Sequence, residues 1–466
     1  MFDSRHERPH PFTALGKWGS RIFLDRYFSL VLFCLACAVT ACEWEVKGAV
    51  FFASAVCLAL VVCDDILAAL LPFLLLCTFV TNCYDSAALF LPYTPMIIPV
   101  FGSFLFHFIV YRQPLRAGST LWGHIAVAVA ITLGGLGTIT ASEYFSGSAI
   151  YHTLFLGLGM LGGYLLFKSQ MGMKRDYDVR QRLLTTFYIA GMFAAFMILY
   201  FLLEKRTTDG ILAPLTTLQC ANNLSTILMF ALPCPFFFAS KNRMHWISAL
   251  VMFFCLLYSG SRAGMLLGTA ELLLCLVVTA LWDRPRRFFY VCTLAAVVSL
   301  AVFYHEEVFD LLATYHLYPL EDAARRGLIE RSFSAFRSSP VFGQGLGYRG
   351  NSDLYSPVRG ALPWYHMMIP QIVGSLGLLG ILAYLIQALS QGVAAVTSIS
   401  KSRGAERGLV ITVILSYVGI LMMSQVNPGL FCPLPSAMMA GMLFATIDGE
   451  NGLAPIAYLR ENRNRK

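Results

Sequence analysis

Arginine and histidine side chains at the edges of apolar segments are the residues of this chain that could do chemistry. The first is Arg262 in SGSRAG (residues 259–264), a turn of small residues between two apolar segments. If those segments cross a bilayer, the turn can hold a lipid phosphate, because the guanidinium stays charged and binds two phosphate oxygens at once. The alternative is an arginine that extends to the membrane interface as an anchor.

A long polar stretch from His305 to His366 holds the other candidates. About 60 residues pass there without a segment apolar enough to cross a bilayer, and they include six arginines and no lysine. Connections of this length between structural elements are more often functional than idle. We therefore look for the site in this loop.

The part of the loop between Glu321 and Ser339 predicts an amphipathic helix. Apolar residues recur there at the spacing of one helix face, at Leu328, Ile329, Phe333 and Phe336. The same segment carries Arg331 and Arg337 among its four arginines. Such a helix either rests on anionic lipid headgroups or turns an arginine toward an anionic substrate, and the sequence leaves both interpretations open.

The loop ends in a glycine cluster and a histidine. FGQGLGYRG (342–350) follows Pro340, and His366 stands directly before the next apolar segment. The glycines permit tight turns and close approach to a ligand. A histidine at a membrane boundary can accept or donate a proton near neutral pH, although an ordinary interfacial histidine is the alternative.

Composition indicates a polytopic membrane protein. Of the 466 residues, 57% are hydrophobic and 13% charged, with a mean hydropathy of +0.66. The 13 cysteines stand singly in or beside apolar segments, which predicts packing and no disulfide framework. No Walker motif, HExxH motif or carboxylate cluster occurs, so we expect no cofactor and no metal. The net charge of +8 comes largely from basic residues in short connections between apolar segments, which is typical of cytoplasmic loops. We therefore expect no nucleic-acid partner.

We expect 12 to 14 transmembrane helices in an all-α chain. The candidate spans cover residues 27–42, 48–63, 66–82, 94–111, 119–140, 149–167, 184–203, 223–240, 244–259, 263–282, 287–304, 367–390, 409–425 and 434–447. The glycine pairs in LGGLG (133–137) and GLGMLGG (157–163) predict close approach between helices.

Basic residues predict the orientation, because lysine and arginine in short loops are retained on the cytoplasmic side. With the N-terminus inside, the short outer loops hold only Lys47, Lys205, Arg206 and Arg262. Along the chain, short connections that are rich in basic residues alternate with connections that are poor in them. The exception is a turn at Asp64 and Asp65, which is predicted to lie inside but has no basic residue. We therefore expect cytoplasmic tails at 1–26 and 448–466, helices over 27–304 and 367–447, and an extracytoplasmic loop over 305–366 carrying catalytic residues.

The chain resembles the O-antigen ligase and polymerase superfamily in three motifs and in their order. These are SGSRAG between two spans, SFSAFRSSPVFGQGLG in a long outer loop, and a histidine at the start of a span that continues GSLGLLG. The resemblance covers roughly residues 220–390 by motif. Two departures stand out. Gly374 and Ser375 occupy positions where relatives often carry a carboxylate, and Met367 follows the histidine where relatives often have asparagine.

The resemblance implies a glycosyltransferase of the GT-C type in the bacterial plasma membrane. Such enzymes transfer a glycan from an undecaprenyl-diphosphate carrier to a hydroxyl of a glycan or lipid acceptor, without a metal. On this basis Arg262, Arg331 and Arg337 bind the diphosphate, and His366 and Arg331 are catalytic. Two arginines can stabilise the charge on the leaving diphosphate, and His366 can take the acceptor proton.

A flippase or transporter of the same lipid-linked glycans is the competing hypothesis. Transporters place ionisable residues at mid-membrane depth, and here only Glu271, His107 and His124 are such candidates. The large outer loop favours the transferase. The sequence leaves open whether the enzyme is a ligase or a polymerase, and which sugar it transfers.

Overall fold

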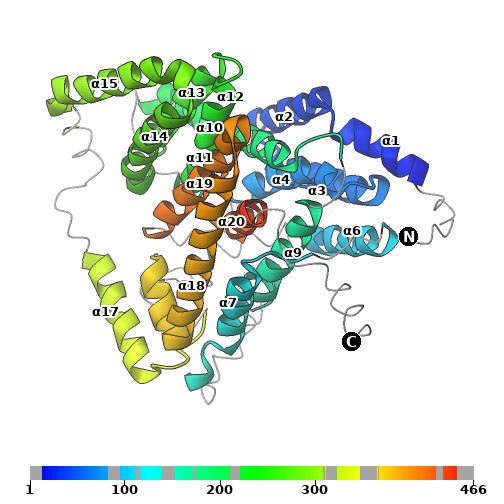
Figure 1. The fold of residues 1–466 in the computed structure, drawn as a ribbon, viewed down its shortest axis with the longest axis vertical. Coiled ribbons are helices and arrows are strands. Elements are labelled where there is room, and N and C mark those ends of the chain that lie inside the picture. Colours follow the sequence, from blue (N-terminus) through cyan, green and yellow to red (C-terminus); the bar gives the residue numbers. More distant parts are fainter. Residues whose placement is uncertain are drawn as a thin grey trace.

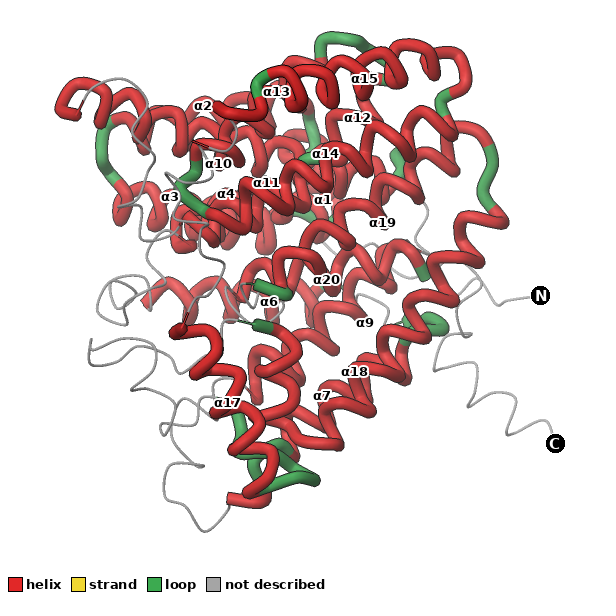
Figure 2. Tube along the Cα trace, turned by 90° about the vertical axis from the view of Figure 1, so that its left-hand side faces the viewer, coloured by secondary structure: helices red, strands yellow, loops and turns green. Residues whose placement is uncertain are grey.

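The protein is described here from a computed structural model. It describes residues 13–81, 95–111, 116–138, 153–171, 175–209, 221–307, 310, 323–346, 365, 367–426 and 434–448. Within these ranges every regular element is helical and no strand occurs. Figures 1 and 2 show helices stacked in several layers, with α18 crossing most of the height of the molecule.

The helices follow the apolar segments of the sequence. Their bounds are α1 (Thr13–Phe23), α2 (Arg26–Ala41), α3 (Glu45–Val62), η1 (Ile66–Ala69), α4 (Leu70–Thr81), α6 (Ile97–Val110), α7 (Leu121–Leu133), η3 (Leu136–Thr138), the π-helix η4 (Thr153–Gly159), α9 (Met160–Met171), α10 (Val179–Asp209), α11 (Ala221–Ala231), α12 (Pro233–Ala239), α13 (His245–Tyr258), α14 (Arg262–Trp282), η5 (Arg284–Arg286), α15 (Arg287–Phe303), α17 (Ala323–Ser338), α18 (Met368–Lys401), α19 (Gly404–Ser424) and α20 (Leu434–Ile447).

Each of the 14 predicted spans coincides with one helix or with two consecutive helices. Among the described residues, five helices are long and apolar enough to cross a bilayer alone, and the pair α1 and α2, bent by 60°, makes a possible sixth. Shorter apolar helices, such as Leu121–Leu133 and His245–Tyr258, accompany them. The chain is an all-α polytopic membrane protein. The count of 12 to 14 spans and the domain boundaries remain predictions.

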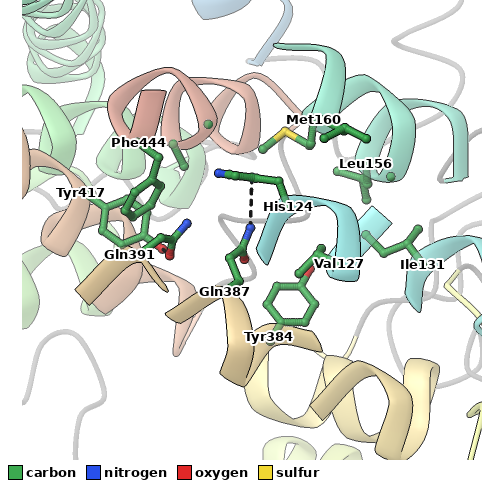
Figure 3. A pocket seen from close by; sticks show the side chains of 14 residues that line it. His124, Val127, Ile131, Leu156, Met160, Tyr384, Gln387, Gln391, Tyr417 and Phe444 are labelled. Carbon is green, nitrogen blue, oxygen red and sulfur yellow. Dashed lines mark hydrogen bonds between the residues drawn. The ribbon is translucent and has the colours of Figure 1, made fainter. Parts of the chain in front are cut away.

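The core lies where α10, α11, α12, α13, α14 and α19 pack together. Phe187 and Phe193 of α10 and Phe230 of α11 are fully buried there, and the rings of Phe187 and Phe230 meet edge to face at 5.0 Å. Exposed apolar residues, including Leu385 and Val393 of α18, cover the outside, as expected of helices that face lipid. A separate cavity is left where α7, α18, α19 and α20 meet (Figure 3).

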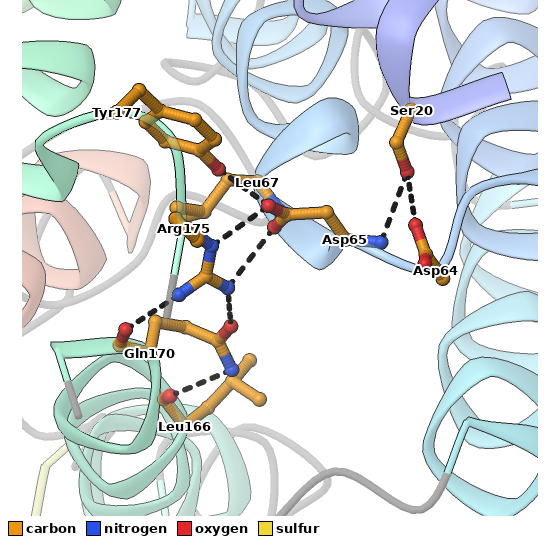
Figure 4. Close-up of polar contacts among 8 residues, drawn as sticks. All are labelled: Ser20, Asp64, Asp65, Leu67, Leu166, Gln170, Arg175 and Tyr177. Atoms are coloured by element: carbon orange, nitrogen blue, oxygen red, sulfur yellow. Dashed lines mark hydrogen bonds and ion pairs between the residues drawn. The ribbon is translucent and has the colours of Figure 1, made fainter. Parts of the chain in front are cut away.

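An ion pair joins the Asp64–Asp65 turn to the basic segment before α10 (Figure 4). The Arg175 guanidinium donates to both carboxylate oxygens of Asp65, from Nε at 2.7 Å and from Nη2 at 3.1 Å, and the Tyr177 hydroxyl donates to Asp65 Oδ2. Burial, together with the Asp65 carboxylate, raises the pKa of Tyr177 far above its usual range, so its hydroxyl remains a donor. The acidic turn thus shares a face with a segment predicted to be cytoplasmic.

Other predicted inside segments contact one another near the same face. Arg182 donates to the carbonyl of Leu24, Lys241 to Gln181, and Arg286 to the carbonyl of Ser240. Arg180 pairs with Glu406 at 3.3 Å, shortly after α18 ends at Lys401. The basic segments therefore gather at one end of α18, whereas its first residue, Met368, lies at the other end. Which face is cytoplasmic remains a prediction.

The glycine pairs behave differently from one another. A Cβ on Gly134 would lie 2.5 Å from Leu376 Cδ2, and one on Gly137 would lie 1.7 Å from Ser339 Oγ, so LGGLG allows the expected close approach. At Gly162 and Gly163 of GLGMLGG, no atom of the described residues lies within 4 Å of the Cβ position. The expectation was therefore wrong for this second pair.

Candidate functional site

The SGSRAG turn is fixed by hydrogen bonds to the start of α11. Ser261 is the N-cap of α14, and its hydroxyl oxygen accepts from the amide of Gly264 at 3.0 Å. The same hydroxyl donates to Asn222 Oδ1 at 2.6 Å. Gly260 has a φ of +79°, a conformation that favours glycine. This short motif therefore ends one helix, caps the next and binds a third.

Behind this cap, small residues allow α14 to approach α11. The buried Ser225 hydroxyl donates to Ser259 Oγ at 2.9 Å, and a Cβ on Gly264 would lie 2.6 Å from Ser225 Oγ. Two helix N-termini consequently lie side by side, and each carries a partial positive charge. Arg262, the first residue of α14, is exposed beside them. This arrangement suits an anionic group.

The predicted amphipathic helix is confirmed as α17, but its buried face differs from the expected one. Leu328, Ser332, Ala335 and Ser339 are buried, whereas Ile329 and Phe333 are exposed. The reason is that α17 packs against α18, and the small side chains of Ser332 and Ala335 permit a closer approach than bulky apolar ones. Arg331 is half-buried and Arg337 is exposed.

The first turn of α18 binds the residues adjacent to Arg331 and His366, the two predicted catalytic residues. The Ser332 hydroxyl, next to Arg331, donates to the carbonyl of Pro370 at 2.7 Å. The backbone amide of Tyr365 donates to Gln371 Oε1 at 2.8 Å, and Gln371 Nε2 donates to Ser375 Oγ at 2.8 Å. Ser332, Tyr365, Gln371 and Ser375 are all buried. His366 itself lies outside the described residues.

Gly374 lies between these two anchors. A Cβ there would be 3.0 Å from the Tyr365 hydroxyl oxygen and 3.1 Å from Ser332 Oγ. The neighbours of Arg331 and His366 therefore meet at one residue of α18. A side chain larger than hydrogen at Gly374 would therefore press on the Tyr365 ring and on Ser332.

The glycine cluster of the loop binds α18 where that helix is broken. Gly377 has a φ of +60° inside α18, which interrupts the helical hydrogen bonds. The amides of Gln344 and Gly345 donate to the carbonyls of Gly374 and Ser375 at 3.1 and 2.7 Å.

In return, the amides of Leu378 and Leu379 donate to the carbonyls of Pro340 and Val341, at 2.8 and 3.0 Å. The loop thus replaces hydrogen bonds that the break removes. The glycine cluster was predicted to approach a ligand closely. Gly343 and Gly345 instead approach the backbone of α18.

The two halves of the predicted site lie on separate elements. Arg262 begins α14, and Arg331 and Arg337 belong to α17, in another part of the molecule (Figure 1). Their convergence on one substrate remains a prediction.

Sequence reasoning missed Gln371, although a glutamine in an apolar segment five residues after His366 was the available signal. In the described part of the chain, no three His, Cys, Asp or Glu residues group as metal ligands.

Comparison with known proteins adds one match. Residues 247–385 match the family model described as O-antigen ligase. The matched range runs from α13 into α18 and includes Arg262, Arg331 and His366. No match is found among curated proteins.

Proposed function

Residues 247–385 place this chain in the O-antigen ligase superfamily, and from this premise we propose that it transfers a glycan from undecaprenyl diphosphate to a hydroxyl acceptor. Ligase or polymerase activity of the general kind follows from the family. The lipid-linked donor, the acceptor on a glycan or lipid, and the metal-independent mechanism are our proposal. The site would lie on the outer face of a bacterial plasma membrane, in a GT-C-type architecture with both termini in the cytoplasm.

The arrangement of α18 supports this orientation. Ser332 and Tyr365, which are adjacent in sequence to Arg331 and His366, are anchored at Pro370 and Gln371 near the start of the helix, whereas the basic segments gather near its end at Lys401. If those basic segments are cytoplasmic, as their composition predicts, the site is extracytoplasmic. ATP and nucleotide sugars are absent there, so a donor activated by its own diphosphate is needed.

The reaction requires one nucleophilic displacement and one proton transfer. The acceptor hydroxyl oxygen bonds to the anomeric carbon as the bond from that carbon to the diphosphate oxygen breaks. The diphosphate leaves with the electron pair, and Arg262 and Arg331 stabilise its charge. His366 takes the hydroxyl proton. Arg337, exposed at the end of α17, assists in holding the diphosphate.

The observation that carries the proposal is the meeting of Ser332 and Tyr365 at Gly374. The hydrogen bonds of Ser332 and Tyr365 to Pro370 and Gln371 hold the residues next to Arg331 and His366 at the same turn of α18, so the proposed anion-binding group and the proposed base would share one support. Catalytic groups need such support because misplacement by about 1 Å costs large factors in rate.

One observation favours the transporter. Glu271 lies within α14, is fully buried, and has no hydrogen-bond partner on either carboxyl oxygen among the described residues. Ionisable residues inside a membrane commonly mark transport pathways. We therefore keep movement of a lipid-linked glycan across the membrane as the second candidate function.

Transfer in vitro tests the proposal. Purified protein is mixed with an undecaprenyl-diphosphate-linked glycan and candidate acceptors in the presence of EDTA. We expect product, as a single added unit from a ligase or as a size ladder from a polymerase. Absence of product with every acceptor, together with donor movement across proteoliposomes, would instead establish the transporter.

A further inference from the structure

Helix α1 lies at the edge of the bundle, in the stretch that the sequence predicts to be a cytoplasmic tail (Figure 1). It is bent by 60° from α2, so it leaves the direction of the predicted span at 27–42. Its sequence, TALGKWGSRIF, contains a lysine and an arginine but no acidic residue. The side chains of α1 form three faces, and none of them belongs to the site proposed above.

The inner face of α1 packs on the turn after α3. Gly16, Gly19 and Ser20 are buried there. A Cβ on Gly16 would lie 2.9 Å from Asp64 Cβ, and one on Gly19 would lie 2.8 Å from Val62 Cγ1. The Ser20 hydroxyl donates to Asp64 Oδ1 at 2.6 Å. This close packing and the hydrogen bond hold α1 at one rotation about its axis, so its other two faces have fixed directions.

The second face is an apolar stripe that the described chain leaves exposed. Leu15, Trp18 and Ile22 follow one another at spacings of three and four residues, which places them on one side of a helix. Leu15 is 45% and Trp18 61% exposed, and Ile22 is half-buried. Burial of apolar side chains is favourable, and tryptophan is enriched at the boundary between water and a bilayer. The stripe therefore suits an apolar layer that is covered by polar groups.

The third face is basic. Lys17 and Arg21 lie four residues apart and are exposed, and neither side chain has a hydrogen bond or ion pair among the described residues. At 3.6 residues per turn, this pair lies about 110° around the helix from the apolar stripe. Cations beside an apolar stripe match the surface of a bilayer, where anionic phosphates lie next to hydrocarbon.

Helix α2 places the apolar stripe beside lipid. It begins at Arg26, shortly after α1 ends at Phe23, and its exposed apolar residues include Leu30 and Val31, as expected of a span that faces hydrocarbon. At its start the Arg26 guanidinium lies 4.7 Å from the centre of the Tyr27 ring. Tyrosine is enriched at membrane boundaries, and arginine beside a span commonly stands there. The end of α1 therefore lies at the edge of the hydrocarbon, where lipid rather than a soluble protein is next to the stripe.

We propose that α1 lies in the membrane interface and binds anionic phospholipid headgroups. The apolar stripe enters the boundary between headgroups and acyl chains, and Lys17 and Arg21 donate to lipid phosphates. The packed inner face couples this contact to the turn at Asp64 and thereby fixes the depth at which α2 begins. The proposal is independent of glycan transfer, because it uses no residue of the proposed donor site.

Fluorescence quenching by brominated lipids tests the position of α1. The full-length protein is reconstituted in phosphatidylcholine vesicles whose acyl chains carry bromine near either the ester or the methyl end. The signal of Trp18 is obtained by subtracting the spectrum of Trp18→Phe, which keeps an apolar ring at an exposed position and is checked by size-exclusion chromatography. We expect bromine near the ester to quench Trp18 about twofold more strongly. Absence of quenching by either lipid would place α1 in water or under another protein and overturn the proposal.

A second measurement tests the preference for anionic lipid. Brominated phosphatidylglycerol, or equally brominated phosphatidylcholine, is added as a minor component to unbrominated phosphatidylcholine, and each variant is compared with its own Trp18→Phe counterpart. The anionic lipid should quench Trp18 about twofold more strongly, because basic residues attract it. Lys17→Gln/Arg21→Gln should remove this difference.

The control is Arg243→Gln/Arg284→Gln, which removes two exposed arginines from other segments of the same predicted side and should keep the difference. Equal quenching by both lipids in the unsubstituted protein, or an unaltered difference in Lys17→Gln/Arg21→Gln, would overturn the proposal.

Discussion

Gly343 and Gly377 meet backbone to backbone at the break in α18. A Cβ on Gly377 would lie 2.7 Å from the amide nitrogen of Gly343, and one on Gly343 would lie 2.4 Å from the carbonyl carbon of Ser375. Both glycines have positive φ, +67° for Gly343 and +60° for Gly377. The loop glycines and the span glycines are therefore two parts of one structural unit, which joins α17 to α18.

This contact makes Gly377→Ala strongly destabilising. The substitution places a side chain at positive φ, which costs about 1–2 kcal/mol, and also forces backbone atoms apart. We expect the midpoint of thermal unfolding in detergent to fall by several degrees. Gly392→Ala on the same helix is the matched control, because nothing lies within 4 Å of its Cβ position. It should be neutral or stabilising by about 0.5–1 kcal/mol, and an equal loss in both variants would contradict the account.

Gln371→Leu should lower transfer with little loss of folded protein. The leucine cannot accept from the Tyr365 amide, and a buried amide left without a partner costs about 1–3 kcal/mol, so the backbone beside His366 would shift. We expect kcat to fall about tenfold, which corresponds to about 1.4 kcal/mol in the activation free energy, because a shifted base is less well placed in the transition state. Gln371→Glu retains the acceptor oxygen and should recover part of the activity.

The pH dependence of kcat separates positioning from general destabilisation. If Gln371 positions His366, the variant should change the pH profile as well as its height, since the surroundings of the base have changed. A variant with normal kcat and an unaltered profile would show that the Tyr365 contact does not matter for catalysis.

Arg262→Ala should abolish transfer while the protein still inserts in the membrane. The side chain is exposed, so its removal should leave the fold intact and the loss would report diphosphate binding. Arg262→Lys should also be damaging, because an ammonium group cannot bind two phosphate oxygens in a planar fork. Arg243→Ala, exposed at the other end of α13, is the control and should be fully active.

Arg331→Ala should likewise abolish transfer, whereas Arg337→Ala should reduce it less. Arg331 is half-buried next to the anchored Ser332, and Arg337 is exposed near the end of α17. The readout is product formed from the lipid-linked donor at saturating acceptor. Full activity of Arg331→Ala would remove α17 from the catalytic site.

Arg175→Ala should destabilise the protein far more than Arg180→Ala does. The side chains of Arg175 and Asp65 are 7% and 13% exposed, so removal of the arginine leaves a buried carboxylate without its cation, at a cost of about 3–5 kcal/mol. The partner of Arg180, Glu406, is 59% exposed and can be solvated by water. Thermal unfolding of both variants gives the comparison, and equal midpoints would contradict it.

The sequence by itself determined the membrane class and the positions of the helices. Apolar segments long enough to cross or enter a bilayer must be helical, because lipid offers no partner for backbone N–H and C=O groups. It also pointed to SGSRAG and to the α17 segment, because few arginines of this chain lie in short loops on the predicted outer side and because the long loop holds six.

Only the tertiary structure decided which residues support the site. The break at Gly377, the loop amides that complete it, and the anchor of Ser332 on α18 join segments separated by about 30 to 40 residues. Periodicity within one helix carries no information about such pairings. Ile329 and Phe333 show why periodicity does not identify the buried face of α17. Apolar residues of a membrane protein can face lipid as well as protein, and only packing against α18 decides which face is buried.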